Sequence, residues 1–175
     1  MTEVLDWDHA VLDIPEAGLK IERAATPEER ETIARTLELV ACSSLLANYK
    51  ISPKSEGHFR LAGTLTVRVE QTCVVTLEPL TNDISESYSV DFWPDNKLPA
   101  QEGGLVDVHD EPDMEPILAG RIEAGRIIFE CLAGAIDLFP RKPGATFEHP
   151  SDATVTRASE GSGPFAALAK IRQKR

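Results

Sequence analysis

The feature that most constrains the fold is a two-residue alternation of apolar and polar side chains in the middle of the chain. In "HFRLAGTLTVRVE", residues 58–70, Leu65, Val67 and Val69 alternate with polar residues. In "ISESYSVDFW", residues 84–93, four apolar side chains alternate with serines and an aspartate. This period is typical of strands that are buried on one face and solvated on the other. We therefore expect a meander of antiparallel strands.

Shorter extended segments flank these two strands and are separated from them by turn-forming residues. They are expected at residues 10–14, 19–24, 48–52 and 73–77. The last of these, "CVVTL", is almost continuously apolar and leads into Pro79, which predicts a buried strand that ends in a stiff turn. Gly63 lies within an otherwise regular strand pattern and predicts a bulge.

A long helix is predicted over residues 27–48. Thr26 is a natural N-cap, Pro27 suits the first helical position, and Glu29 stands where a capping box requires an acid. Apolar residues from Ile33 onward recur at three- and four-residue steps and form one buried stripe, with Cys42 at its edge.

A second helix is predicted over residues 122–136. Its apolar positions repeat at helical spacing as far as Phe139, and Pro140 lies just past its end. Strands and helices together predict an α+β fold, in which an antiparallel sheet is packed by two main helices.

The remainder of the chain predicts one domain followed by a tail. Residues 94–116 carry seven acidic residues and read as an exposed acidic loop, with one short strand at "GLVDV", residues 104–108. Residues 1–150 are expected to form the single α+β domain, 151–163 a flexible linker, and 164–175 a short basic amphipathic tail.

Charge limits the classes of partner. The chain has 29 acidic and 18 basic residues, which gives a formal net charge of -11 at pH 7. Such a surface repels nucleic-acid backbones and anionic membranes, so we expect no DNA or membrane partner, and rRNA contact only indirectly. The N-terminal residues lack the order of a secretory signal, and the three cysteines make a poor disulfide framework. We therefore expect a cytoplasmic protein.

No metal, cofactor or catalytic residue is expected. The four histidines are isolated, and no pair of cysteines has the spacing of a zinc site. The segment "EGSGPF", residues 160–165, lacks the lysine of a phosphate-binding loop. Cys73 is a candidate nucleophile, but its apolar neighbours favour structural packing.

A small basic site at Arg141 and Lys142 is the remaining candidate. These residues stand between two prolines directly after the second helix, on an otherwise acidic chain. They form either a rigid turn with solvated charges or a binding site for phosphate or an acidic partner.

Several stretches together resemble one family. "GTLTVRVEQTCVVTLEPL", "ISESYSVDFWP", "EPILAGRIEAGRIIFECLAGAIDLFPRKPGA" and "PFAALAKI" are similar, in this order, to the bacterial YceD family in its alphaproteobacterial form. The likeness runs from Trp7 to Arg175. Many family members carry two cysteines two residues apart before Leu-Glu, whereas here Cys73 is followed at that spacing by Thr76. The second thiol of a metal or redox pair is thus missing.

The resemblance implies a non-enzymatic role in the accumulation of large-subunit ribosomal RNA, with a ribosomal protein or a pre-ribosomal large-subunit particle as partner. A structural role is assigned to the family-motif residues Cys73, Leu77, Glu78, Pro79, Pro140, Pro143 and Gly144. The candidate interaction residues are Arg141, Lys142, Lys170, Arg172, Lys174 and Arg175. One alternative is direct binding of single-stranded RNA by the sheet, and another is a cysteine-dependent enzyme that uses Cys73.

Overall fold

A computed structural model describes residues 4–94 and 113–146. In chain order the strands and α-helices are β1 (Asp8–Ala10), β2 (Leu19–Ala24), α1 (Pro27–Thr36), β3 (Ala41–Pro53), β4 (Phe59–Thr72), β5 (Pro79–Pro94), β6 (Asp113–Ile117), β7 (Arg121–Glu123) and α2 (Ala124–Ala135). Two single-turn 3₁₀ helices, η1 (Val11–Asp13) and η2 (Ser55–Gly57), complete the described part. The α+β class predicted from sequence is confirmed.

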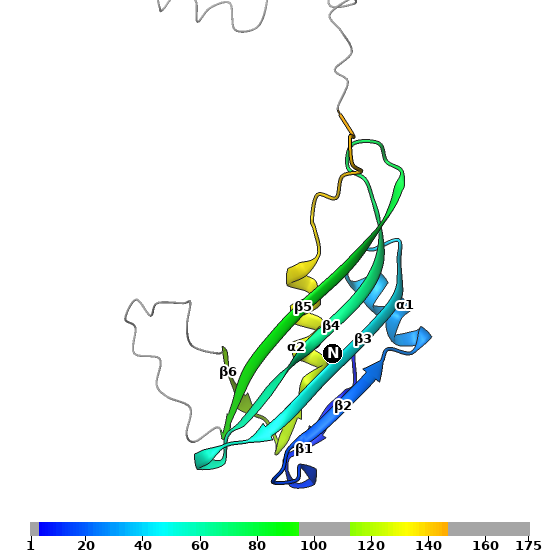
Figure 1. Cartoon of the computed structure of the whole chain (residues 1–175). Helices are drawn as coiled ribbons and strands as arrows, with labels where there is room; N and C mark the ends of the chain where they lie inside the picture. The colour runs from blue at the N-terminus through cyan, green and yellow to red at the C-terminus, as the bar shows by residue number, and fades with distance from the viewer. Residues whose placement is uncertain (1–3, 95–112, 147–175) are drawn as a thin grey trace, which may run out of the picture. The chain divides into compact units, whose positions relative to one another are not determined.

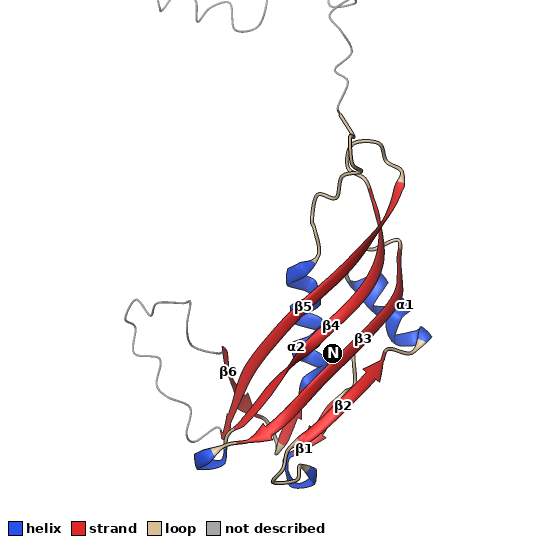
Figure 2. Cartoon of the chain, viewed as in Figure 1, coloured by secondary structure: helices blue, strands red, loops and turns tan. Residues whose placement is uncertain are grey.

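The central sheet has the strand order β2-β3-β4-β5-β6. The first four strands form the expected antiparallel meander, and β6 is added parallel to the end of β5. A second sheet pairs β1 with β7. Figure 1 shows α1 and α2 on one face of the central sheet, behind it in this view, and Figure 2 shows no helix on the other face. We call this second face the open face.

The alternation in the sequence matches these two faces. Inward residues such as Leu65, Val67 and Phe92 are buried in a core shared with both helices. The open face carries small hydroxyl residues and two cross-strand ion pairs between β4 and β5. These are the pairs Arg60–Asp91 and Arg68–Asp83, each with two nitrogen–oxygen distances of 2.7–2.9 Å.

The long helix predicted for residues 27–48 is wrong beyond its first ten residues. The predicted capping box is present, since the Thr26 hydroxyl accepts from the Glu29 amide and the Glu29 carboxylate accepts from the Thr26 amide. The helix nevertheless ends at Thr36, and Glu38 has a left-handed φ of 54°. From Ala41 the chain forms β3, because the long strand β4 supplies a hydrogen-bonding partner along its whole length. Tertiary pairing here overrides helix propensity, and Cys42 is buried on this strand rather than on a helix.

Three further sequence predictions need correction. "CVVTL" is the turn between β4 and β5, and part of the extended segment at 10–14 is the 3₁₀ helix η1. Gly63 is not a bulge, because its register with both neighbours is unbroken; the irregularity lies between Cys42 and Ser44. A side chain at Gly63 would overlap the Asn48 carbonyl, so glycine is needed for close strand approach.

The second helix was predicted almost correctly and spans Ala124–Ala135. Within the described ranges, neither α-helix has the length and apolar content needed to cross a membrane. Strand β6 lies at the end of the predicted acidic loop. Residues 104–108, the linker and the basic tail lie outside the described residues.

Candidate functional site

The turn between β4 and β5 brings the Cys73 motif to one end of the sheet. The Leu77 amide donates to the Cys73 carbonyl and the Cys73 amide to the Glu78 carbonyl, both at 2.9 Å. Leu77 adopts a left-handed φ of 59°, and its side chain is exposed rather than buried. The turn is therefore closed by its own backbone and does not rely on burial of Leu77.

Cys73 itself is completely buried at the base of this turn. Its Sγ accepts from the backbone amides of Thr76 and Lys142, both at 3.4 Å. Hydrogen bonds, first from the Thr76 side chain and then from these amides, lower the pKa of the thiol to about 6, although burial opposes the shift. The sulfur joins two segments that are far apart in sequence, and a substrate has no direct access to it.

The segment after α2, residues 137–142, runs to this turn. The Pro140 carbonyl accepts from the Val74 amide at 2.9 Å. The side-chain amide of Gln71, at the end of β4, donates to the Asp137 carbonyl at 2.8 Å. Asn82 of β5 in turn donates to the Gln71 side-chain oxygen at 2.8 Å. Polar groups on both long strands thus hold the start of the segment, and the turn holds its end.

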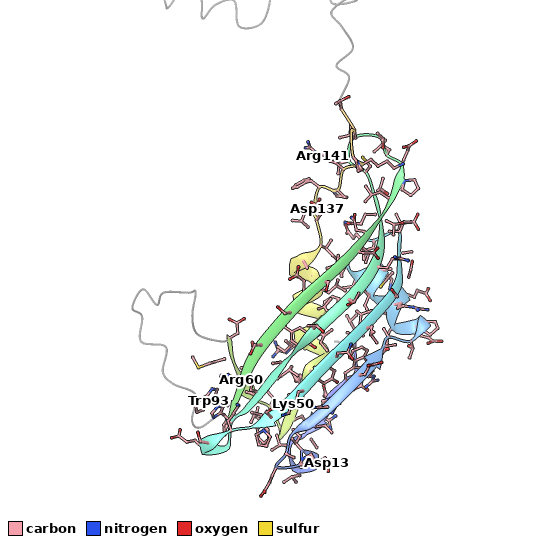
Figure 3. The ribbon with its side chains drawn as sticks, viewed as in Figure 1. Asp13, Lys50, Arg60, Trp93, Asp137 and Arg141 are labelled. Carbon is pink, nitrogen blue, oxygen red and sulfur yellow. The ribbon has the colours of Figure 1, made fainter. Side chains whose placement is uncertain are left out.

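The structure separates the two cations that the sequence placed together. Lys142 Nζ lies 2.7 Å from Glu78 Oε2, and this contact lowers the pKa of the Glu78 carboxyl. Arg141 is exposed, and no carboxylate in the described part of the chain lies within 4.0 Å of it. Figure 3 shows Arg141 and Asp137 on the segment that runs to the turn. One basic side chain of the pair is therefore neutralised and the other faces solvent.

Large exposed apolar side chains lie on the two segments that meet next to Arg141. We define the tip surface as Val74, Leu77, Leu138, Phe139 and Arg141. The four apolar residues are 44%, 77%, 77% and 69% exposed, respectively. Exposed large apolar residues that cluster on adjoining segments are typical of protein interaction sites.

Sequence reasoning assigned only Arg141 of this surface to an interaction site, and it expected Val74 and Leu77 to be buried in a strand. It placed Phe139 on the buried stripe of the second helix, but the helix ends at Ala135 and the following residues turn outward. It did not single out Leu138 at all. The available signal was Pro140, which cannot continue a helix and so makes the residues before it a connecting segment.

The remaining predicted residues fall into three groups. Pro79 begins β5 and Pro140 is buried. Pro143 and Gly144 belong to a separate unit that begins at residue 143, where Gly144 has a φ of 78° that favours glycine. Lys170, Arg172, Lys174 and Arg175 lie outside the described residues.

Comparisons of the chain with protein-family models, curated proteins and solved structures find no match in any of the three. Among the described residues, no three His, Cys, Asp or Glu side chains are placed to hold a metal ion. The arrangement at the tip surface is suited to binding, because it offers exposed apolar area and a cation, Arg141, that no carboxylate of the described residues pairs with.

Proposed function

We propose that this chain is a cytoplasmic, non-enzymatic factor that promotes accumulation of large-subunit ribosomal RNA by binding a ribosomal protein or a pre-ribosomal particle. The binding site is the tip surface. The observation that carries the proposal is that the two motif blocks, some 65 residues apart, form one surface through the Val74–Pro140 and Cys73–Lys142 hydrogen bonds. The resemblance to the YceD family rests on these same blocks.

The geometry gives less support to the two alternatives. A sheet that binds single-stranded RNA exposes aromatic side chains beside cations. Here Phe59 and Phe92 are buried in the core, and Arg60 and Arg68 are engaged by aspartates. A cysteine enzyme requires an accessible thiolate, whereas Cys73 is buried beneath its own turn.

The test is sedimentation of the tagged full chain through a ribosome gradient, together with co-purification from nuclease-treated lysate. The test variant replaces Leu77 and Phe139 by serine, and the control replaces Leu12. Leu12 is 96% exposed on η1, which Figure 1 places at the opposite end of the sheet from the β4–β5 turn. Because all three side chains are exposed, each variant should keep its stability to within about 0.5 kcal/mol per substitution.

We expect the wild type and the Leu12→Ser variant to migrate with large-subunit precursors and to support normal large-subunit rRNA levels. The double variant should lose both properties. Migration of all three proteins at the top of the gradient, with normal rRNA in a deletion strain, would contradict the proposed function.

A further inference from the structure

The outer edge of β5 is the longest unpaired strand edge in the described part of the chain. β5 has sixteen residues and pairs with β4 over Pro79–Phe92. On its other side β6 pairs only with Val90–Pro94. Residues Pro79–Ser89 therefore have no partner strand on that side among the described residues, and Figure 2 shows β6 beside only one end of β5.

This edge carries two charged side chains, Asp83 and Glu86, but few of the other devices that usually prevent strand addition. Proteins blunt exposed edges with lysines, prolines, bulges or very short strands. Between Pro79 and Ser89 there is no lysine or arginine, the only proline is the first residue, and the register with β4 has no bulge. By contrast, the opposite edge strand β2 is six residues long and carries Lys20 and Arg23.

The charge beside the edge is negative. Glu86 is exposed near the middle of the free stretch. Burial raises the pKa of the Cys131 thiol on α2, and the negative charge of Glu86 raises it further. Asp83 is already paired with Arg68.

The neighbouring strand β6 continues this negative charge. Arg126 of α2 is bound by Glu115 of β6, Glu123 of β7 and Glu130 of α2, at 2.8–2.9 Å. One positive and three negative groups leave this cluster at −2. The free edge and its surroundings are thus complementary to a segment that carries cations.

We propose that the free edge of β5 binds an extended, lysine- or arginine-bearing segment of a protein partner by strand addition. Main-chain hydrogen bonds supply affinity in such complexes, and side chains at alternate positions supply specificity. The tip surface lies at the start of the same strand and receives apolar residues of the partner. This inference rests on the proposed function. It states which kind of segment the ribosomal partner would contribute to the contact.

The test uses the full chain labelled with ¹⁵N and an eleven-residue peptide that alternates lysine with valine. One control peptide has glutamate in place of each lysine, and another has proline in place of each valine. We expect the lysine peptide to slow amide hydrogen exchange in residues 79–89, and neither control peptide to do so. The proline peptide keeps the charge but loses backbone donors.

Two charge-neutralising variants locate the site. Glu86→Gln should weaken lysine-peptide binding about threefold at low salt, in line with the loss of one exposed charge pair. Glu22→Gln, the same change on the opposite edge strand β2, should leave the affinity unchanged within the error of the titration.

Several results would overturn the inference. These are protection of β2 instead of β5, equal binding of the proline peptide, or equal weakening by both variants. Protection of residues 79–89 that rises with protein concentration, without peptide, would assign the edge to a second copy of the chain. Stronger protection by oligouridylate would assign it to RNA.

The peptide test and the ribosome gradient can fail separately. Peptide binding without gradient migration leaves the edge site intact and rejects the ribosomal role. Migration without peptide binding keeps the ribosomal role and rejects the edge as the contact.

Discussion

Replacement of Gln71 by leucine tests how the tip surface is held in place. Gln71 is only 7% exposed and joins three parts of the chain, since it donates to the Asp137 carbonyl and accepts from the Asn82 amide. Leucine has a similar volume but can make neither hydrogen bond. Each such bond contributes about 1 kcal/mol, so we expect the free energy of unfolding to fall by about 2 kcal/mol.

Urea unfolding monitored by circular dichroism measures this change. The midpoint should fall while the slope stays constant, because the surface exposed on unfolding is unchanged. For a domain of this size, a loss of about 2 kcal/mol lowers the melting temperature by roughly 6–10 °C. The Val74 amide, which donates to Pro140, should exchange faster because the segment is less well held.

The matched control is Thr66→Leu. Thr66 is exposed on the open face of the same strand, so its replacement should change stability by less than about 0.5 kcal/mol. Suppose that Gln71→Leu also lowers the free energy of unfolding by less than about 0.5 kcal/mol, and that the Val74 amide still exchanges slowly. Water then replaces both hydrogen bonds. Gln71 would then not anchor the segment, and the reasoning would be refuted.

Two other predictions concern β4 and the turn. The methyl group added by Gly63→Ala would overlap the Asn48 carbonyl and lie 2.6 Å from Tyr49 Cβ. Overpacking of this kind should lower the free energy of unfolding by about 2–3 kcal/mol. A urea midpoint within error of the wild-type value would contradict this prediction. For Cys73, thiolate absorbance near 240 nm should rise around pH 6 and be lost in Cys73→Ser, since the pKa values of Cys42 and Cys131 are raised. Because the folded pKa of Cys73 lies below its ordinary value of 9.0, the stability it contributes is complete above pH 9 and falls as pH drops towards 6. The difference in free energy of unfolding between wild type and Cys73→Ser should therefore shrink as the pH falls from 9 to below 6. A difference that stays constant over this range would show that Cys73 is not a thiolate in the folded protein.

Local patterns in the sequence identified the two longest strands, β4 and β5, and the approximate starts of the helices. The alternation over 58–70 and 84–93 correctly predicted β4, most of β5 and their two faces, because side-chain orientation along a strand depends only on position. The capping box at Thr26 correctly located the first helix, because its hydrogen bonds join residues three apart. The resemblance singled out the two blocks that meet at the tip, but it contained no information about their contact.

Contacts between distant residues decided what local patterns could not. The apolar residues after Thr36 fit both a helix and a strand. They form a strand because β3 hydrogen-bonds along the backbone of β4. Phe139 fits the apolar stripe of α2 until the chain turns at Ile136 to reach Cys73. The sequence by itself thus determined an α+β fold whose sheet has one buried face and one solvent-exposed face. Tertiary structure decided which side chains form the tip surface and that Lys142 is neutralised. It also decided that, among the described residues, Arg141 has no carboxylate partner and most of one edge of β5 has no partner strand. Each of these depends on groups brought together only by folding.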